Sequence, residues 1–351
     1  MFDFLFGLFS EDLGIDLGTA NTLVLIRGKG IAIREPSVVA LHRKSKELLA
    51  VGREAKEMLG KTPQNILAIR PLREGVISDF DSAYKMIKYF IHKTHRFPSF
   101  LPKIPKPRVV IGVPSGVTEV ERKAVMDAAL ASGARKVYLV EQPMAAAIGA
   151  GLPVEKASGN LIIDSGGGTT EVAVISLYGV VNSKSLKVAG DRLDSAIIDF
   201  AREKYNLLLG QTSAEEVKIN IGAVGDLAKM PEVNEKRATL RGRDLETGLP
   251  RSFEVSASDL KESLEKEVIH IAKAVKETIE ETPPELVSDV IKKGIFLAGG
   301  TSLLTGLPEF IENYTGVKCQ VCKDPLTAVV RGAGILLEEE KLLKRVAIAV
   351  S

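Results

Sequence analysis

The sequence predicts an α/β protein with two similar lobes. Segments with the apolar pattern of strands are interspersed with segments of helical periodicity, as in α/β domains. One strand–turn–strand motif occurs twice, first near Asp16 and again near Asp164. The chain of 351 residues is long enough for two domains of ordinary size. Together these observations indicate a duplicated α/β architecture.

The first half of the chain contains a regular series of expected elements. Two apolar runs around a Gly-Thr-Ala-Asn turn predict a hairpin over residues 13–27, and a further strand is expected at 37–41. Helices are expected at 54–59, 82–95 and 119–132, the last ending at Gly133, and strands at 108–113 and 137–140. Small residues at 144–151 predict a helix against which another backbone packs closely.

The second half continues the alternation. A hairpin is expected at 160–175, helices at 193–205 and 213–219, and a surface strand pair at 238–253. A long amphipathic helix is expected at 260–281, where Thr282-Pro-Pro ends it and a further helix begins. A buried strand at 295–298 ends in Gly299-Gly300, and the last helix is expected at 327–344.

Composition excludes several classes of protein. Apolar residues make up 45% and charged residues 26% of the chain, close to a soluble globular average. The 47 Lys and Arg nearly balance the 45 Asp and Glu, which argues against nucleic acid as a partner. With 12 Phe, 6 Tyr and no Trp, a binder that relies on aromatic stacking is disfavoured. No apolar run approaches the length of a membrane span.

The two cysteines form a Cys319-Gln-Val-Cys322 motif. Two cysteines do not make a disulfide framework, so a reducing cytoplasm is expected. The motif is also compatible with a redox pair or half a zinc site, but Val317, Cys319 and Val321 alternate as in a strand, where positions three apart face opposite ways. A structural role is therefore favoured, as it is for the helically spaced His92 and His95.

The N-terminus is unusually apolar and predicts contact with a membrane surface. The residues in question are Phe2, Phe4, Leu5, Phe6, Leu8 and Phe9. A signal peptide would begin with basic residues, whereas a short amphipathic anchor fits better; packing on the core is the alternative. A second apolar tip, with Phe97, Phe100 and Leu101, lies in a proline-punctuated loop and either contacts the membrane or folds back.

The repeated motif carries the chemistry. In each copy an apolar strand ends in an aspartate, Asp16 or Asp164, and a Gly/Thr turn leads into a second strand. Glycine lets the backbone approach an anion, and successive N–H groups of such a turn bind phosphate. An aspartate beside phosphate needs an intervening cation, and hydrated Mg²⁺ fits that position. Two opposed loops of this kind predict an ATP site. Neither a P-loop nor a kinase motif set is present.

At these residues the chain resembles the actin, sugar-kinase and DnaK-type ATPase superfamily, and more closely the MreB family of bacterial actins. The resemblance extends from about residue 11 to 340. It also covers the stretches Arg34-Glu-Pro-Ser-Val-Val-Ala40, Glu141-Gln-Pro-Met-Ala-Ala-Ala-Ile-Gly149 and Arg241-Gly-Arg-Asp-Leu-Glu-Thr-Gly-Leu-Pro250. It implies an actin-like ATPase fold, with two duplicated lobes and four subdomains around a nucleotide cleft.

The resemblance also implies a division of the chain. Residues 1–10 would be the amphipathic membrane-binding segment, and 11–150 the first lobe with a small subdomain inserted at about 33–80. Residues 151–340 would form the second lobe, with an insertion at about 205–260. The last helix, about 327–344, would return to the first lobe.

By motif, the resemblance assigns site residues. Glu141 would orient or deprotonate the attacking water, with Thr170 as a weaker candidate helper; helix N-capping and a structural strand start are the alternatives. Asp16 and Asp164 would hold Mg²⁺ through water. Contacts to the nucleotide are implied for a larger set: Thr19, Ala20, Asn21, Gly166, Gly167, Gly168 and Thr169 at the phosphates, Glu215, Glu216 and Lys218 at the ribose, and Gly299, Gly300, Thr301 and Ser302 at the adenine.

Three departures from the family pattern concern this site. Ser165 replaces an aliphatic residue, Thr301-Ser302 replaces Gly-Ala, and Gln142 stands where a second glutamate is common. They suggest a divergent member, and the hydrolysis rate is the property most exposed to them.

Two functions follow as expectations. The first is an ATP-hydrolysing homopolymer of paired protofilaments at the inner face of the cell membrane, guiding wall synthesis with MreC, MreD and RodZ as implied partners. Weak anchors on each subunit would add up along a polymer. The second is a soluble sugar-kinase-like or chaperone-like ATPase, or an assembly factor that does not polymerise.

Overall fold

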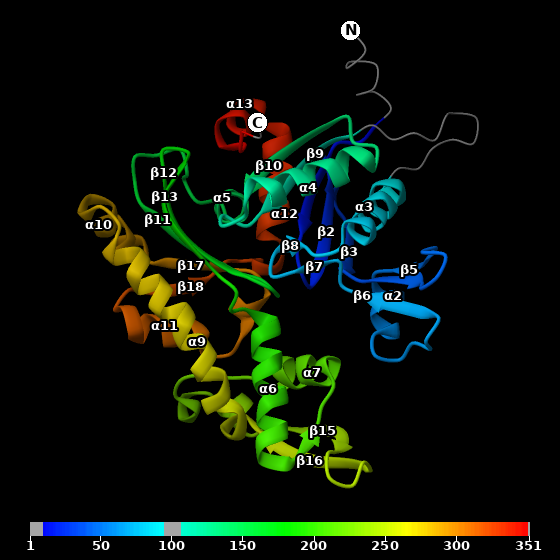
Figure 1. Cartoon of the computed structure of the whole chain (residues 1–351). Helices are drawn as coiled ribbons and strands as arrows, with labels where there is room; N and C mark the ends of the chain where they lie inside the picture. The colour runs from blue at the N-terminus through cyan, green and yellow to red at the C-terminus, as the bar shows by residue number, and fades with distance from the viewer. Residues whose placement is uncertain (1–9, 95–106, 350–351) are drawn as a thin grey trace. The chain divides into compact units, whose positions relative to one another are not determined.

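The computed structural model describes residues 10–94 and 107–349, which divide into two compact units (Figure 1). The first unit contains the chain up to residue 157, residues 175–180 and the chain from residue 326 onward. The second unit contains residues 158–174 and 181–325. Among the described residues no helix combines the length and apolarity that crossing a membrane requires.

A five-stranded sheet forms the centre of the first unit, in the order β10-β9-β1-β2-β3. β1, β9 and β10 are parallel, whereas β2 pairs antiparallel with both β1 and β3. The strands are β1 (Leu13–Leu17), β2 (Asn21–Ile26), β3 (Gly30–Pro36), β9 (Arg108–Val113) and β10 (Lys136–Glu141). The three parallel strands therefore end at one edge of the sheet.

Helices cover both faces of this sheet because alternate strand residues point in opposite directions. Leu13 and Ile15 pack in one apolar cluster with residues of α3 (Phe80–Thr94) and α4 (Glu119–Ala131). The intervening Gly14 faces Ala333 and Gly334 of α12 (Ala328–Glu338) instead. The other helices of this unit are α2 (Arg53–Met58), α5 (Gln142–Gly149) and α13 (Glu340–Val346).

α5 and α12 cross at backbone contact, as the small residues predicted. A Cβ at Gly149 would lie 1.8 Å from the carbonyl oxygen of Ala328, and one at Gly332 would lie 1.9 Å from that of Ala145. Only glycine fits at either position, because real Cβ atoms do not approach to such distances. The expectation of a closely packed partner for this helix is confirmed.

Asp12 connects the beginnings of the parallel strands. Its buried carboxylate accepts from the main-chain nitrogen and the guanidinium of Arg108, at 2.7–2.9 Å, and from Arg135 at 3.3 Å. Burial alone would raise the pKa of Asp12, but the bonds and charges of the arginines outweigh it and lower that pKa. Asp12 therefore joins the first residue of β9 to the segment that precedes β10.

Two smaller sheets complete the first unit. β4 (Val39–His42) lies between β5 (Leu48–Val51) and β6 (Ile66–Ile69), and α2 packs on this sheet. β7 (Leu72–Arg73) and β8 (Val76–Ile77) form a two-stranded hairpin.

The second unit has a five-stranded sheet of the order β13-β12-β11-β17-β18. β11 (Asn160–Ser165), β17 (Ile295–Ala298) and β18 (Cys319–Val321) are parallel. β12 (Thr170–Ser176) lies next to β11, and β13 (Gly179–Leu186) lies beyond β12 at the edge of the sheet. Asp164 pairs with Ala298, so Asp164 and the residues after β17 meet at one sheet edge.

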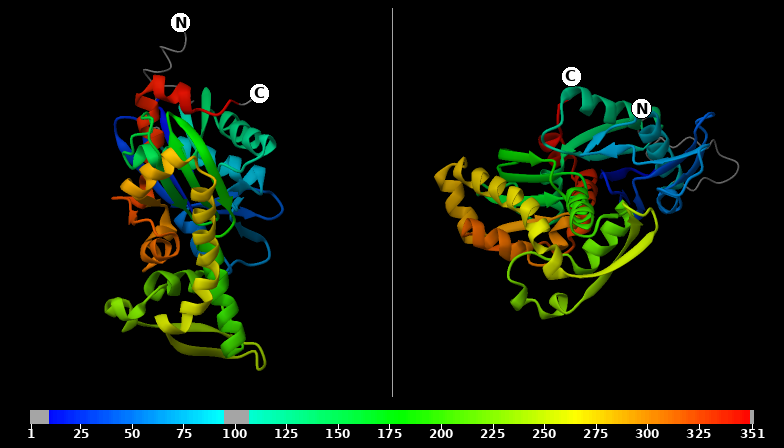
Figure 2. Two further views of the ribbon diagram at one scale, coloured as in Figure 1. Left: turned by 90° about the vertical axis from the view of Figure 1, so that its left-hand side faces the viewer. Right: turned by 60° about the horizontal axis from the view of Figure 1, so that its bottom comes forward.

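Helices pack on this sheet around one apolar core, which includes Leu161, Ile163, Val172 and Val174. The helices that contribute to this core are α6 (Gly190–Tyr205), α7 (Gln211–Ile221), α9 (Ala257–Glu280), α10 (Pro284–Lys293) and α11 (Leu307–Thr315). Of these, α7 packs against α6 and β15 (Arg237–Asp244). α6 and the long α9 lie side by side, green and yellow in the left view of Figure 2. A capping box between Ser256 and Asp259 begins α9.

A three-stranded sheet forms the small part of this unit, with β14 (Leu207–Leu208), β15 (Arg237–Asp244) and β16 (Pro250–Ser256). The turn between β15 and β16 folds around Asp244, whose Oδ1 accepts from the nitrogens of Glu246 and Thr247. Arg251 bonds the other oxygen at 2.6 Å. The short α8 (Pro231–Asn234) precedes β15.

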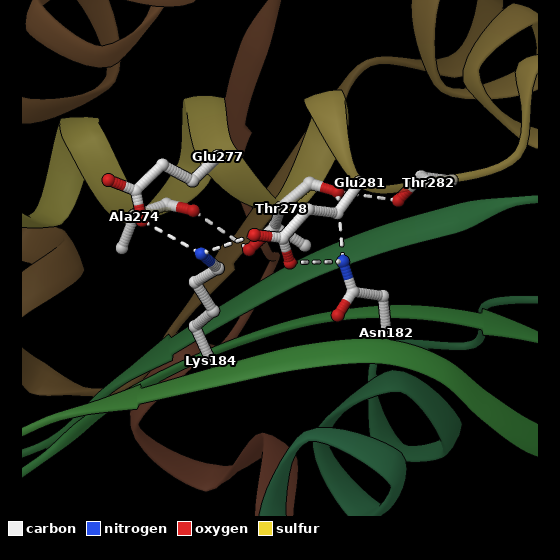
Figure 3. A network of polar contacts seen from close by, with 7 residues as sticks. All are labelled: Asn182, Lys184, Ala274, Glu277, Thr278, Glu281 and Thr282. Carbon is white, nitrogen blue, oxygen red and sulfur yellow. Dashed lines mark hydrogen bonds and ion pairs between the residues drawn. The ribbon is translucent and has the colours of Figure 1, made fainter.

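The C-terminal turn of α9 carries acidic residues and no basic one, which the helix dipole disfavours. β13 supplies the compensation (Figure 3). Lys184 Nζ lies 2.8 Å from Glu277 and 2.9 Å from Glu281, and Asn182 donates to the carbonyl of Thr278. The hydroxyl of Thr282 closes the helix by donating to the same carbonyl at 2.6 Å.

Several observed elements differ from the sequence expectations: β3, β5, β6, β7, β8, β14 and α8 had no expected counterpart, and three further differences have a clear physical reason. The last helix, expected as one piece over 327–344, is two helices, because Glu339 leaves helical geometry with φ −105° and ψ 77° in the acidic run before α13. β13 was not expected, since its pattern is mixed and partly exposed. α11 was also not expected, because it is short and lies between turns at Gly306 and Gly316.

Candidate functional site

The turn between β1 and β2 is the first glycine loop. Leu17 pairs with Thr22, so Gly18, Thr19, Ala20 and Asn21 make the connection. Ser37, which is fully buried, donates from Oγ to the carbonyl of Gly18 at 2.6 Å, and its main-chain nitrogen donates to Ala20 at 3.0 Å. A second segment of the unit therefore holds this turn.

The neighbouring hydroxyls of this loop are also engaged. Thr19 Oγ1 accepts from the nitrogen of Gly75 in the β7–β8 hairpin at 3.0 Å, and the side chains of Thr22 and Ser37 lie 2.8 Å apart. Thr19 is buried, whereas Asn21 is exposed at the start of β2. Hydrogen bonds from Ser37 and Gly75 thus hold one side of the loop, while Asn21 on its other part is exposed.

Asp16 and Glu141 occupy the same edge of the first sheet. Asp16 pairs with Gly112 and Glu141 with Val113, so the two acids end β1 and β10 on either side of β9. Burial raises the pKa of Asp16 to about 7. Within residues 10–94 and 107–349 this carboxylate has no hydrogen-bond or ion-pair partner, so its chemistry suits a cation.

Glu141 combines two properties of a proton acceptor. Burial raises its pKa, and the bond from Ser115 Oγ, 3.4 Å from Oε2, and the charge of Arg122 oppose that effect. It also precedes α5 as the N-cap residue without a side-chain capping bond. Its carboxylate is therefore not engaged in capping the helix, and Gln142 beside it is buried.

The second glycine loop joins β11 to β12. Gly166 N donates to the carbonyl of Thr169 at 2.9 Å and closes the turn. Ser165 and Thr170 lie at its two ends with their hydroxyls 2.6 Å apart, and Thr170 donates to the carbonyl of Val188 at 2.7 Å. Since Thr170 has one hydroxyl hydrogen, Ser165 is the donor to Thr170. The hydroxyl of Ser165, a departure from the family pattern, thus closes the base of the loop.

The beginning of α6 packs against the same loop. Gly190 N donates to the carbonyl of Gly166 at 3.2 Å, and Asp191 N donates to that of Gly167 at 2.8 Å. A Cβ at Gly190 would lie 3.5 Å from Gly167 and 3.3 Å from Lys218 Nζ. The helix N-terminus therefore supplies main-chain donors that fix the loop.

The turn after β17 completes this cluster. Gly299 has φ +82°, and a Cβ there would lie 2.2 Å from the carbonyl oxygen of Ser165. Thr301 Oγ1 donates to the carbonyl of Gly166 at 2.7 Å, and Ser302 Oγ donates to that of Gly299 at 2.6 Å. The two hydroxyls that depart from the family pattern here both have defined partners, while Gly300 is exposed.

α7 contributes Lys218, but not Glu216, to the cluster around the second glycine loop and the beginning of α6. Lys218 Nζ donates to the carbonyl of Gly190 at 2.8 Å and lies 2.6 Å from Asp194 Oδ1. Glu215 is three positions before Lys218 and shares its side of the helix, whereas Glu216 is two positions before it and faces elsewhere. Glu216 instead lines a separate pocket of about 470 Å³ beside β15, with Lys236 and Arg241.

Sequence reasoning missed four residues of these clusters: Ser37, Gly190, Asp191 and Asp194. Asp194 had a signal, because it lies between Leu193 and Ile197 on the apolar side of α6. Its carboxylate is buried, and this burial raises its pKa to about 6 despite the charge of Lys218. Ser37 and Gly190 gave no local signal, since their partners are distant in sequence.

The cysteines are not among the residues expected to contact the nucleotide, although Cys322 lies close enough to Asp164 for that carboxylate to raise the pKa of its thiol. Cys319 is buried on β18, and burial raises the pKa of its thiol to about 12 and that of Cys322 to about 11. Such thiols are poor nucleophiles at neutral pH. In the described part of the chain no group of three His, Cys, Asp or Glu residues is arranged to hold a metal by itself. His95 lies outside the described residues.

The family model of the MreB/Mbl proteins matches residues 10–345. The chain belongs to the MreB/Mbl family. It is 48% identical to the cell shape-determining protein MreB of Escherichia coli, over 95% of this chain and 94% of that protein. It is 44% identical to the cell shape-determining protein Mbl of Bacillus subtilis, over 96% and 99%.

Solved structures agree on the fold of this MreB/Mbl chain. The structure of MreB5 of Spiroplasma citri bound to AMPPNP superposes with a TM-score of 0.87 and is 36% identical, covering 95% of this chain and 97% of MreB5. The MamK double helical filament gives a TM-score of 0.78 at 23% identity, covering 94% and 99%, and shows the fold alone. The fold is therefore that of an actin-like ATPase, as the sequence predicted.

Proposed function

We propose that this MreB/Mbl protein binds and hydrolyses ATP and polymerises into membrane-associated filaments that determine cell shape by organising wall synthesis. The observation that carries the proposal is the repeated loop: Gly18 and Gly166 follow Asp16 and Asp164 at strand ends, and each carbonyl is held by a buried hydroxyl. The Spiroplasma citri relatives bound to AMPPNP and to ADP support the choice of ligand.

The phosphates would bind to the main-chain N–H groups of the two loops. These belong to Thr19, Ala20 and Asn21 in the first unit and to Gly167, Gly168 and Thr169 in the second. Gly166 would lie beside the phosphates without donating, because its N–H already bonds the carbonyl of Thr169. Glu215 and Lys218 would contact the ribose, and the turn Gly299–Ser302 would pack beside the adenine. Glu216 was also expected at the ribose, but we assign it no contact there because it lies two positions before Lys218 on α7 and so faces a different side of the helix.

Asp16 and Asp164 would hold a hydrated Mg²⁺ through its waters. Both carboxylates lie at strand ends beside a glycine loop, and the unpartnered Asp16 fits an ion that keeps its water ligands. When bound, the ion would neutralise charge on the phosphates.

Glu141 is the proposed general base. In hydrolysis the oxygen of a water attacks the terminal phosphorus, the proton of that water passes to the carboxylate, and ADP leaves. The raised pKa of Glu141 brings its basicity closer to neutral pH. Thr170 is retained only as a helper that fixes the loop, since its buried hydroxyl already donates to Val188.

Membrane binding is assigned to two segments outside the described residues. They contain Phe2, Phe4, Leu5, Phe6, Leu8 and Phe9 in one and Phe97, Phe100 and Leu101 in the other. Individually weak anchors would combine along a filament of paired protofilaments. This places the polymer at the inner membrane face, where MreC, MreD and RodZ are the proposed protein partners.

Sedimentation tests the proposal against a soluble ATPase. Purified protein is expected to pellet with ATP and Mg²⁺ and to remain in the supernatant without nucleotide. ATP hydrolysis without pelleting over a range of protein concentrations would instead support a non-polymerising enzyme, whether kinase-like or chaperone-like. Absence of ATP binding in calorimetry would reject both the polymerising ATPase and the non-polymerising enzyme.

Vesicle flotation tests the anchor separately. Deletion of residues 2–9 is expected to reduce flotation with phosphatidylglycerol-containing vesicles while ATP-dependent pelleting persists. Measurements below the polymerising concentration remove the contribution of avidity. Equal flotation of the full and shortened chains would reject this segment as an anchor.

A further inference from the structure

The carbonyl of Gly166 is a junction of three segments of the second unit. It accepts from Gly190 N of α6 at 3.2 Å and from Thr301 Oγ1 after β17 at 2.7 Å. Lys218 of α7 in turn donates to the carbonyl of Gly190. The segments assigned to phosphate and adenine therefore meet at the oxygen of Gly166, and the segment assigned to the ribose is joined to them through Gly190.

Fixing this oxygen also fixes a donor. The peptide group is planar and trans, so its C=O and the next N–H point in opposite directions. With Gly166 O held by Gly190 and Thr301, the N–H of Gly167 points away from α6 and away from the turn of Thr301. The bond from Asp191 N to Gly167 O orients the N–H of Gly168 in the same way.

Thr301 is the side-chain part of this arrangement. Residues 166–168 are all glycine and have no side chains of their own to restrict the backbone. The Thr301 hydroxyl is buried, at 7% exposure of the residue, and its donated hydrogen is committed to Gly166. The Thr301 hydroxyl therefore donates its hydrogen to the loop and has no hydrogen left to donate to a base.

The first unit contains an equivalent hydrogen bond to its glycine loop, donated by a residue from a different part of the fold. Gly18 corresponds to Gly166 in the repeat, and its carbonyl accepts from the buried Ser37 Oγ at 2.6 Å. Ser37 follows β3 and Thr301 follows β17, so the two donors lie at unrelated positions in their units. The recurrence at the equivalent carbonyl argues that the bond serves the loop.

We propose that Thr301 is a positioning residue of the second phosphate loop, which acts by orienting the Gly166–Gly167 peptide although its turn lies on the adenine side. The proposal rests on nucleotide binding as proposed above. This role differs from that of a residue that contacts the base. Substitution of a positioning residue must also weaken the binding of a ligand that has phosphates but no adenine.

Calorimetry with two partial ligands tests this assignment. Thr301→Val keeps the shape and removes the donor, and we expect about fivefold weaker binding of Mg²⁺-tripolyphosphate, the effect of losing one hydrogen bond. Adenosine should bind within about twofold of wild type. Thr301→Ser restores the hydroxyl and should restore tripolyphosphate binding.

A matched control measures the cost of losing any buried threonine donor. Thr282 donates to the carbonyl of Thr278 at 2.6 Å, far along the chain from the loop, and Thr282→Val should leave tripolyphosphate binding unchanged. Amide exchange in the ligand-free protein gives a second readout: the Gly167 and Gly168 amides should exchange faster in Thr301→Val than in Thr301→Ser.

The outcomes separate this inference from the proposed function. Weaker adenosine binding with unchanged tripolyphosphate binding would overturn the positioning role and assign Thr301 to the base. Equal loss of tripolyphosphate binding in Thr282→Val would reduce the effect to general destabilisation and overturn it as well. Wild-type protein that binds neither ATP nor tripolyphosphate would overturn the nucleotide function itself.

Discussion

Lys218 Nζ lies 2.6 Å from Asp194 Oδ1 beside the start of α6 in the second unit, where Asp194 is buried and Lys218 is partly exposed. The lysine also donates to Gly190, whose nitrogen bonds the glycine loop. Asp194 is thus the counter-ion of a residue assigned to the ribose, although it does not contact the loop itself. A buried carboxylate whose pKa is raised on folding makes stability depend on pH.

Asp194→Asn is expected to change the pH profile of unfolding. Burial raises the folded pKa of Asp194 to about 6 from 3.8, so the folded state holds this proton more tightly. The contribution of Asp194 to stability is complete below pH 3.8 and is lost as pH rises through about 6. The free energy of unfolding of wild type should therefore fall relative to the variant by about 3 kcal/mol over this range.

Urea unfolding at several pH values measures this difference. Asp199→Asn on the exposed side of α6 is the control, and its profile should parallel that of wild type. Parallel profiles for Asp194→Asn as well would show that the proton of Asp194 does not distinguish the folded from the unfolded state.

Glu141→Gln is expected to slow hydrolysis by about 10²- to 10⁴-fold, the usual contribution of a general base. The amide is nearly isosteric but does not accept the proton. ATP affinity should stay within about twofold, because Glu141 is not assigned to binding. Phosphate release at saturating ATP measures the rate, and calorimetry measures the affinity; unchanged release would exclude Glu141 as the base.

Asp12→Asn is expected to lower the free energy of unfolding by about 2 kcal/mol, because it weakens charge-assisted bonds that join β1 to β9 and to the segment before β10. Since the pKa of Asp12 is lowered on folding, its contribution is present above pH 3.8 and is lost in acid. Denaturant titration at neutral and acid pH should show the deficit shrinking as pH falls. Asp226→Asn, at an exposed pair with Lys229, should change stability by less than about 0.5 kcal/mol.

Gly149→Ala is expected to destabilise the first unit by about 3 kcal/mol, because the added methyl would overlap the backbone of α12. Thermal unfolding or soluble yield provides the measurement. Gly179→Ala is the matched control, since its Cβ would lie 3.6 Å from the nearest atom, in ordinary contact. Similar melting temperatures for both variants would mean that the two helices separate without cost.

Much of the site could be predicted because its signals are local. Asp16 and Asp164 each end an apolar strand and precede a glycine turn, and this pattern is complete within a few residues. The same holds for the small residues of α5. They predicted that another backbone packs closely against this helix, although they did not identify α12 as the partner. The strands of both motifs are in the expected places, β1 with β2 and β11 with β12.

The partners of these loops could not be predicted in the same way. Thr301 was expected to pack at the adenine, and the family resemblance implied a ribose contact for Glu216 together with Glu215 and Lys218. The helix angle separates Glu216 from Lys218, and the fold brings Thr301 to Gly166 across 135 positions of sequence. The helix expected over 327–344 divides at Glu339 for a similar reason, since apolar periodicity does not report a local departure from helical geometry.

By itself the sequence determined the two-lobed α/β class, the two aspartate–glycine loops and the family, because each depends on residues close together in the chain or on its overall pattern. Tertiary structure alone decided which groups hold those loops: Ser37 for Gly18, and Thr301 and Gly190 for Gly166. These bonds join segments that become neighbours only after the strands pair. Their existence is therefore a property of the packed units and not of any one segment.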